Sequence, residues 1–182
     1  TGDLIDRGPE SLRSINLAVE ACARFEEGTI LPGNHELMMM TCLLRKGTRE
    51  DFDRWYYNGG KSIFNELDPH EESTINDVLD EIAKRFTEAM ISGPTHLIRN
   101  RTLFVHAGIH PHQDLNIFLG QARFGYPSDG HWAWIRQPFL DWEGGWAQHE
   151  LDLVVHGHSP VILRHIENVD EAAFLLDTVK KH

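Results

Sequence analysis

The sequence TGDLIDRGP at residues 1–9 decides how this chain is interpreted, and GNHE at residues 33–36 is its counterpart. Each segment places side chains that bind cations or phosphate beside a short apolar stretch. Two further segments hold histidine in glycine turns, His106-Ala107-Gly108 and His156-Gly157-His158. Carboxylate, amide, imidazole and guanidinium groups form the set that metal-assisted hydrolysis of a phosphate ester requires. The sequence therefore predicts a metal centre assembled from distant segments.

Composition indicates one globular domain over residues 1–182, with 41% hydrophobic and 25% charged residues. The formal net charge is −11, from 28 acidic and 17 basic residues. We expect no nucleic-acid partner, since no run of Lys or Arg is present to contact a phosphate backbone. The chain shows no signal peptide and no apolar run near the length of a membrane span, so we expect no membrane association.

The two cysteines, Cys22 and Cys42, do not form a CxxC arrangement. We predict that both are buried free thiols, as is typical of a reducing compartment. The expected location is therefore the cytoplasm. The oligomeric state is not indicated by the sequence.

Hydrophobic spacing predicts an α/β fold with a mixed sheet, whose strand-end loops carry the chemistry. We expect helices where apolar residues recur at helical spacing, at 9–28, 37–44 and 73–89, the last of them capped by Ser73. Short β-type runs are predicted at 29–31, 95–99, 102–105, 151–155, 161–166 and 173–176. Residues 47–68 are predicted to be irregular or partly helical, and residues 110–146 loop-rich and aromatic.

The first cluster supplies three candidate residues. Asp3 directly follows a predicted strand end, where a carboxylate can face a crevice and bridge two cations. Asp6 is placed to orient an imidazole or a guanidinium, and Arg7 offers a planar fork for two phosphate oxygens. The alternative is a surface turn with an Asp-Arg ion pair.

The second cluster is the strongest local signal. Asn34 offers a neutral oxygen ligand for a divalent cation, and His35 could donate a proton to a leaving alkoxide. Glu36 could hold that imidazole in the correct tautomer. The alternative is a polar turn that caps the following helix.

His106 and His158 each follow an apolar strand and lie beside glycine, which favours metal ligation over a structural role. For His156 two interpretations stay open, a hydrogen bond within the turn or support of a ligand. Arg136 is a candidate phosphate clamp, and the alternative is a surface arginine stacked on tryptophan. The remaining histidines are interpreted as surface or packing residues. Among them, His112 and His131 are weak candidates for a functional role, because they flank the loop-rich region.

The ordered segments GDLIDRGP, GNHE, HAG and HGHSP resemble the calcineurin-like metallophosphoesterases, and within them the phosphoprotein phosphatase branch. Small bacterial serine/threonine phosphatases look nearest, with diadenosine-tetraphosphate hydrolases behind them. The resemblance runs from Asp3 to about Thr178, and Asn58-Gly59-Gly60 and Trp134-Ile135-Arg136 support it. It implies a mixed β-sheet sandwich flanked by helices.

The resemblance also implies roles for the candidate residues. Asp3 would bridge two metals of the Mn, Fe or Zn class. The ligands of the second metal would be Asn34, His106 and His158. His35 would be the general acid with Asp6 as its partner, and the phosphate would be held by Arg7 and Arg136. A metal-bridging hydroxide would attack phosphorus in line, without a phosphoenzyme.

Two departures from the family pattern lead to further expectations. The GDxHG segment, which supplies the remaining ligands of the other metal, does not occur in these 182 residues. Where relatives read Asp-Thr-Gly, this chain reads Asp177-Thr178-Val179. We therefore expect a domain incomplete at both ends, without its first strand. Such a chain would bind one ion tightly, where the intact protein would hold two.

The leading functional interpretation is a serine/threonine protein phosphatase whose partner is a phosphoprotein or a small phosphorylated substrate. The runner-up is a dinucleoside polyphosphate hydrolase, in which Trp132 or Trp134 would stack on a base, although core packing explains these tryptophans equally well. An alternative from a different class is a truncated, non-catalytic binding or regulatory domain.

Overall fold

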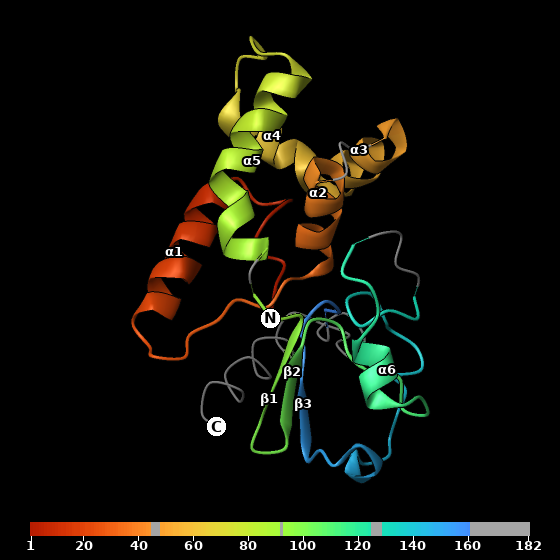
Figure 1. The fold of residues 1–182 in the computed structure, drawn as a ribbon. Helices are drawn as coiled ribbons and strands as arrows, with labels where there is room; N and C mark the ends of the chain where they lie inside the picture. Colours follow the sequence, from red (N-terminus) through yellow and green to blue (C-terminus); the bar gives the residue numbers. More distant parts are fainter. Residues whose placement is uncertain (45–47, 92, 125–128, 161–182) are drawn as a thin grey trace, which may run out of the picture.

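The helices lie mostly above the sheet, and the chain crosses between the two parts near its N-terminus (Figure 1). The structure is a computed structural model that describes residues 1–44, 48–91, 93–124 and 129–160. Its helices are α1 Ser11–Ala23, α2 Asn34–Leu44, α3 Arg49–Trp55, the π-helix η1 Tyr56–Gly60, α4 Lys61–Leu67, α5 Ile75–Ile91, α6 Leu115–Leu119 and the 3₁₀-helix η2 Ala147–His149. Its strands are β1 His96–Arg99, β2 Thr102–Val105 and β3 Leu153–Val155.

The sheet is mixed and has the order β1-β2-β3. β1 and β2 are antiparallel, with Ile98 opposite Leu103, and β2 and β3 are parallel, with Leu103 opposite Val154. The hairpin turn at Asn100 and Arg101 has φ values of 48° and 61°, a pair of left-handed residues that suits the twist of a tight hairpin. The predicted α/β class with a mixed sheet flanked by helices is confirmed.

Some of the predicted strands differ in the structure. Residues 29–31 form no strand, because no described strand lies beside them to complete a hydrogen-bonded ladder. The predicted runs at 161–166 and 173–176 lie outside the described residues. Within the described ranges the strands form a single sheet, so the second layer of the expected sandwich is not among them.

The first predicted helix ends earlier than its spacing indicated. α1 stops at Ala23, where the Arg24 N–H donates to the Ala21 carbonyl at 3.2 Å and the helical pattern gives way to turns. Gly28 then packs against the helix end, since a Cβ there would lie 2.2 Å from the carbonyl oxygen of Cys22. Gly28 thus closes the turn that follows the helix, rather than the helix itself.

Residues 49–67 are helical, so of the two predicted alternatives, irregular or partly helical, the helical one holds and extends further than expected. Thr48 and Asp51 form a capping box that starts α3, and Gly59, at φ 138°, marks the kink inside η1. The cap of α5 is also corrected. The Asp77 N–H donates to the Thr74 hydroxyl at 3.3 Å, whereas the Ser73 N–H donates to Asp68 at 2.8 Å.

α2 connects the two parts of the core. Met39 and Met40 pack in the helical cluster with Trp55 and Ile63, while Leu37 packs in the cluster that includes Leu103 and Val105 of β2. The helix is buried from Asn34 to Cys42. Its N-terminus, where GNHE begins, is therefore fixed from both sides.

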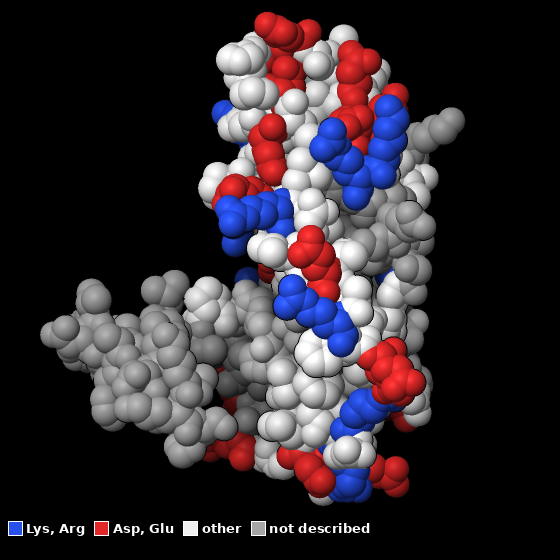
Figure 2. All heavy atoms as spheres, turned by 90° about the vertical axis from the view of Figure 1, so that its left-hand side faces the viewer, with Lys and Arg blue, Asp and Glu red and all other residues white. Residues whose placement is uncertain are grey.

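On the face shown in Figure 2, acidic and basic side chains are interspersed over the described surface and form no continuous basic patch. Among the described helices, none is both long enough and apolar enough to span a bilayer.

The two free thiols have different surroundings. Cys42 is buried as predicted, but Cys22 is only partly buried, which corrects the expectation for that residue. Burial, with the nearby charge of Asp51, raises the pKa of the Cys42 thiol to about 11. As pH rises, the Cys42 thiol therefore loses its proton in the unfolded chain before it does so in the folded chain.

We predict that Cys42 makes the fold less stable as pH rises from 9 to 11, because the unfolded state then ionises before the native state does. The contribution is about 2 kcal/mol in the free energy of unfolding. Urea unfolding of the chain and of Cys42→Ala at a series of pH values measures it. The slope against pH should be shallower in the variant, and equal slopes would contradict the prediction.

Candidate metal centre

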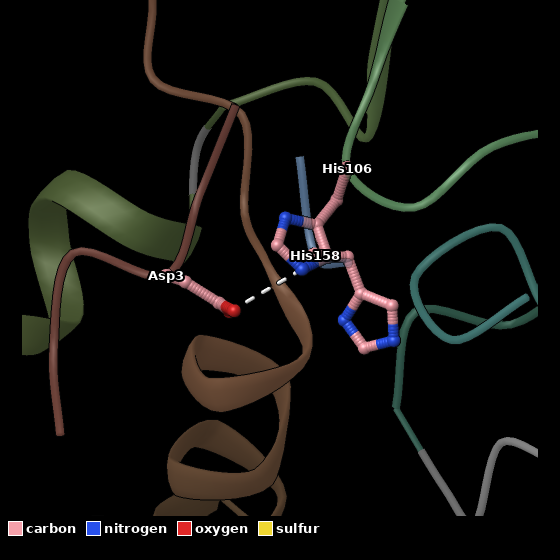
Figure 3. A group of neighbouring side chains, drawn as sticks. All are labelled: Asp3, His106 and His158. Atoms are coloured by element: carbon pink, nitrogen blue, oxygen red, sulfur yellow. Dashed lines mark ion pairs between the residues drawn. The ribbon is translucent and has the colours of Figure 1, made fainter. Parts of the chain in front are cut away.

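The candidate ligands meet at one edge of the sheet because β2 and β3 run parallel. His106 follows β2 directly, and His158 comes three residues after β3. Asn34 opens α2, and Asp3 lies in the N-terminal loop. Figure 3 shows Asp3, His106 and His158 pointing toward one another above the start of a helix. The carboxyl ends of parallel strands thus gather ligands far apart in sequence, as in other α/β sites.

The donor atoms are close enough to share a cation. His106 Nε2 lies 3.0 Å from Asn34 Oδ1 and 3.3 Å from Asp3 Oδ1. His158 Nδ1 lies 2.9 Å from the same Asn34 oxygen. One ligand atom from each of Asp3, His106 and His158 falls within 4.8 Å of the others. The four side chains surround one small volume.

The tautomer of His106 indicates what belongs in that volume. Its Nδ1 lies 2.5 Å from the carbonyl oxygen of Thr1, which can only accept, so Nδ1 carries the proton. In the neutral imidazole, Nε2 then presents its lone pair toward the oxygens of Asn34 and Asp3. Acceptors that face one another in this way are satisfied by a divalent cation, and a backbone partner on the far nitrogen is typical of a metal-ligating histidine. The residues fit a metal ion of the Mn, Fe or Zn class.

The protonation of two ligands also suits a cation. Burial lowers the pKa of His158 to about 4, and the charges of His106 and Arg136 add to this effect, so the imidazole is neutral at pH 7. Burial alone would raise the pKa of Asp3. The contacts with His106 and His35 outweigh that effect and leave the pKa below its ordinary value. Both groups are thus in the form that binds metal.

Glu36 holds the ligand loop in place. Its carboxylate is fully buried and accepts from the N–H groups of Asp3 at 2.8 Å, Leu4 at 2.7 Å and Gly33 at 2.7 Å. Gly33 leaves the necessary space, since a Cβ there would lie 2.3 Å from Asp3 Oδ1 and 2.7 Å from His106 Cε1. The prediction that Glu36 orients His35 is therefore wrong, because these backbone groups occupy its oxygens.

The first loop is strained where it carries candidate residues. Asp3, Asp6 and Arg7 have φ values of 56°, 70° and 59°, in the left-handed region that side chains other than glycine rarely adopt. Such strain persists only where surrounding contacts over-determine it. Here the contacts are the Glu36 carboxylate, the Ser11 hydroxyl that accepts from Asp6 N–H, and the Gly59 carbonyl that accepts from Arg7 N–H.

His35 and Asp6 form a buried pair beside the ligands. His35 Nδ1 lies 2.7 Å from Asp6 Oδ2, and the Trp55 indole N–H donates to both Asp6 oxygens at 3.2 and 3.1 Å. Burial raises the pKa of Asp6, and the hydrogen bonds from His35 and Trp55 partly offset that effect. Asp6 fixes the orientation of the imidazole, and Trp55 fixes the orientation of Asp6.

Two exposed arginines stand near the pair and the ligands. Arg7 donates from Nε to the carbonyl of Asn58 at 3.3 Å, and Gly59 permits the approach because a Cβ there would lie 2.8 Å from Arg7 Cγ. Arg136 is exposed and close enough to His158 for its charge to act on that imidazole. Over the described part of the chain neither arginine forms an ion pair, so both guanidinium groups can meet an anion.

The other suspected aromatic residues have structural contacts. Trp132 is fully buried in the core, so it offers no face to a base. Trp134 is half-buried, with its ring 6.3 Å from that of His158. The His131 Nε2–H donates to the carbonyl of Ala122 at 3.0 Å, and burial lowers its pKa.

Two further histidines also have structural roles. The His156 Nδ1–H donates to the carbonyl of Gly157 at 3.1 Å, so the open question is answered in favour of a hydrogen bond within the turn. His112 packs edge-on against Trp142, with ring centres 5.0 Å apart.

Sequence reasoning missed three supports of the site: the backbone anchor at Glu36, the indole of Trp55 and the carbonyl of Thr1. A signal existed for Trp55, which stands three residues before Asn58-Gly59-Gly60, a segment that already supported the resemblance. No local pattern indicates that a backbone carbonyl sets a tautomer. That contact arises only from folding.

Ligands for a cation, gathered at strand ends beside an imidazole that contacts a carboxylate, suit metal-dependent hydrolysis of phosphoesters, and that is the class of protein this site indicates. The family model described as calcineurin-like phosphoesterase matches residues 1–176, and the chain belongs to this family. A comparison with curated proteins found no match. The family implies metal-dependent hydrolysis of phosphoesters, with divalent cations that activate water and stabilise charge on the phosphoryl oxygens.

Proposed function

We propose that this protein is a serine/threonine protein phosphatase, a hydrolase of phosphate monoesters. The observation that carries the proposal is the buried pair of His35 and Asp6, at 2.7 Å. A serine or threonine alkoxide is a poor leaving group and needs a proton as the P–O bond breaks. When a phosphoanhydride is hydrolysed, the leaving group is a phosphate, which needs far less protonation than an alkoxide. A positioned proton donor therefore favours the ester.

The chain's own residues divide the work of such a reaction. Arg7 and Arg136 hold the phosphate oxygens and fix the direction in which the alcohol leaves. As an imidazolium, His35 would donate the proton on Nε2 to the leaving alkoxide while its Nδ1–H donates to the Asp6 carboxylate at 2.7 Å. Asp6 stabilises the imidazolium before that proton is transferred. The ligands Asp3, Asn34, His106 and His158 would hold the cation.

The surroundings support a phosphorylated protein as substrate over a dinucleoside polyphosphate. Hydrolysis of the latter would gain from an aromatic face that stacks on a base, and Trp132 is removed from consideration by its burial. Trp134, with its ring 6.3 Å from that of His158, is the tryptophan that still supports the dinucleotide alternative. We also propose a cytoplasmic location, which the two free thiols support, and no nucleic-acid partner.

The native protein loaded with Mn²⁺ tests the proposal against three substrates in parallel: a phosphothreonine peptide, an aryl phosphate and diadenosine tetraphosphate. We expect kcat/KM for the peptide to exceed that for the tetraphosphate by at least about tenfold, and Asp3→Asn to abolish turnover of both. Preference for the tetraphosphate would establish the alternative enzyme. No turnover of any substrate would indicate a non-catalytic domain.

A further inference from the structure

A groove of about 350 Å³ lies between α3, η1, α4 and the segment that leads into α5. Its walls include Phe52, Tyr56, Tyr57 and Phe64. We propose that this groove binds the polypeptide beside the phosphorylated residue of the substrate and favours basic side chains there. The inference rests on the phosphatase function proposed above and assigns the groove to its substrate class.

One wall of the groove ends next to the segment that contacts Arg7, the candidate phosphate clamp. Tyr57 lines the groove and immediately precedes Asn58, whose carbonyl accepts from Arg7 Nε at 3.3 Å. The next carbonyl, that of Gly59, accepts from Arg7 N–H at 3.2 Å. Since an extended peptide advances about 3.3 Å per residue, a few residues suffice to pass from a phosphate at Arg7 into the groove.

The aromatic wall is rigid and partly open. The rings of Phe52 and Tyr56 stack with centres 5.2 Å apart, and Phe64 meets Tyr56 edge-on at 5.4 Å. Tyr57 packs edge-on against Tyr56 at 5.3 Å, yet 77% of it is exposed. A large aromatic ring left exposed at a concave surface is typical of a binding site, because covering it releases water at little entropic cost.

The charge of the groove indicates which peptide it favours. Its acidic residues are Asp53, Asp68 and Glu71, and its basic residue is Arg49. Arg49 is already paired with Asp53 at 2.9 Å. Within the described ranges, Asp68 and Glu71 have no Lys or Arg at ion-pair distance, so the net field along the groove is negative. A substrate with Lys or Arg beside its phosphorylated residue is the complementary partner.

The side chain of Asp68 also fixes the far end of the groove. Its carboxylate accepts from the Glu72 N–H at 3.1 Å and the Ser73 N–H at 2.8 Å. This leaves Glu71, exposed and at φ 55°, as the acid best suited to substitution without loss of the turn's hydrogen bonds. A second copy of this chain seated on Tyr57 is the rival occupant.

The test compares two phosphothreonine peptides that differ only in having Lys or Glu at the positions beside the phosphorylated residue. For the native protein, kcat/KM for the Lys peptide should exceed that for the Glu peptide by about fivefold, as expected for a few exposed charges. Glu71→Lys should bring the ratio close to one. Glu20→Lys, an exposed acid on α1, is the matched control and should preserve the ratio. Tyr57→Ala should raise KM for both peptides more than it lowers kcat.

The outcomes separate the two proposals. If neither peptide is hydrolysed while another phosphoester is, the phosphatase assignment fails. If both peptides are hydrolysed with a ratio near one, or if Glu71→Lys leaves the ratio unchanged, the groove assignment is overturned alone. A dimer that Tyr57→Ala dissociates would also overturn it, in favour of self-association.

Discussion

Under the proposed phosphatase function, we expect replacement of His35 with Asn to lower kcat for a phosphothreonine peptide by about two to four orders of magnitude, because the alkoxide then leaves without a proton from the protein. KM and metal affinity should change little, since His35 is not among the ligands. Steady-state kinetics with saturating Mn²⁺ measures the loss. The same substitution should cost much less with an aryl phosphate, whose phenolate is a far better leaving group.

Asp6→Asn is the matched partner of this variant. It keeps the shape of the side chain but removes the charge that stabilises the imidazolium, so its loss should follow the same dependence on the leaving group. Equal losses with peptide and aryl phosphate in His35→Asn would contradict the role of His35 as proton donor. They would assign it to positioning instead.

Glu36→Gln has the second large effect, and it acts on folding before chemistry. The carboxylate accepts three backbone N–H groups, from Asp3, Leu4 and Gly33, without exposure to solvent. The amide nitrogen of Gln would face at least one of these donors and leave it unsatisfied. We expect a loss of about 3 kcal/mol in the free energy of unfolding, with weaker metal binding because Asp3 loses its anchor.

Denaturant unfolding and a metal titration of the same variant measure both effects. Glu20→Gln provides the control, since this exposed glutamate on α1 has the same chemistry without the buried contacts. A Glu36→Gln protein as stable as the control would show that the three contacts do not hold the loop. The anchoring of the strained residues would then need another cause.

The hairpin and the main helices were predictable because their patterns are local. The apolar runs at 95–99 and 102–105 became β1 and β2, joined as predicted at Asn100 and Arg101, of which Asn is a residue type that accepts positive φ. The short run at 29–31 did not become a strand, since a strand needs a neighbour and residue pattern alone does not supply one. The helical segment at 49–67 was predicted only as irregular or partly helical, because its kink at Gly59 interrupts the spacing.

The metal ligands of the site could be predicted from the sequence, but the contacts that hold those ligands in place could not. Residue type alone indicates that a carboxylate, an amide or an imidazole can bind a metal ion. The ligands Asp3, Asn34, His106 and His158 could therefore be selected from the sequence. Glu36 could not be assigned correctly, because its partners are backbone groups on two separate segments. Glu36 follows His35 in the sequence and was the obvious partner for it. In the structure Glu36 contacts backbone N–H groups instead, and Asp6 of the N-terminal loop contacts His35.

A titration of this chain with Mn²⁺, followed by calorimetry, tests the central claim that Asp3, Asn34, His106 and His158 form a cation site. The claim predicts one tight ion per chain, and it predicts that His106→Asn weakens binding by more than about 100-fold, since a ligand matters more than its supporting contacts. His149→Asn, at a histidine that donates to the Pro111 carbonyl, should leave the affinity unchanged. Absence of tight binding, or equal affinity in His106→Asn and the native chain, would contradict the claim.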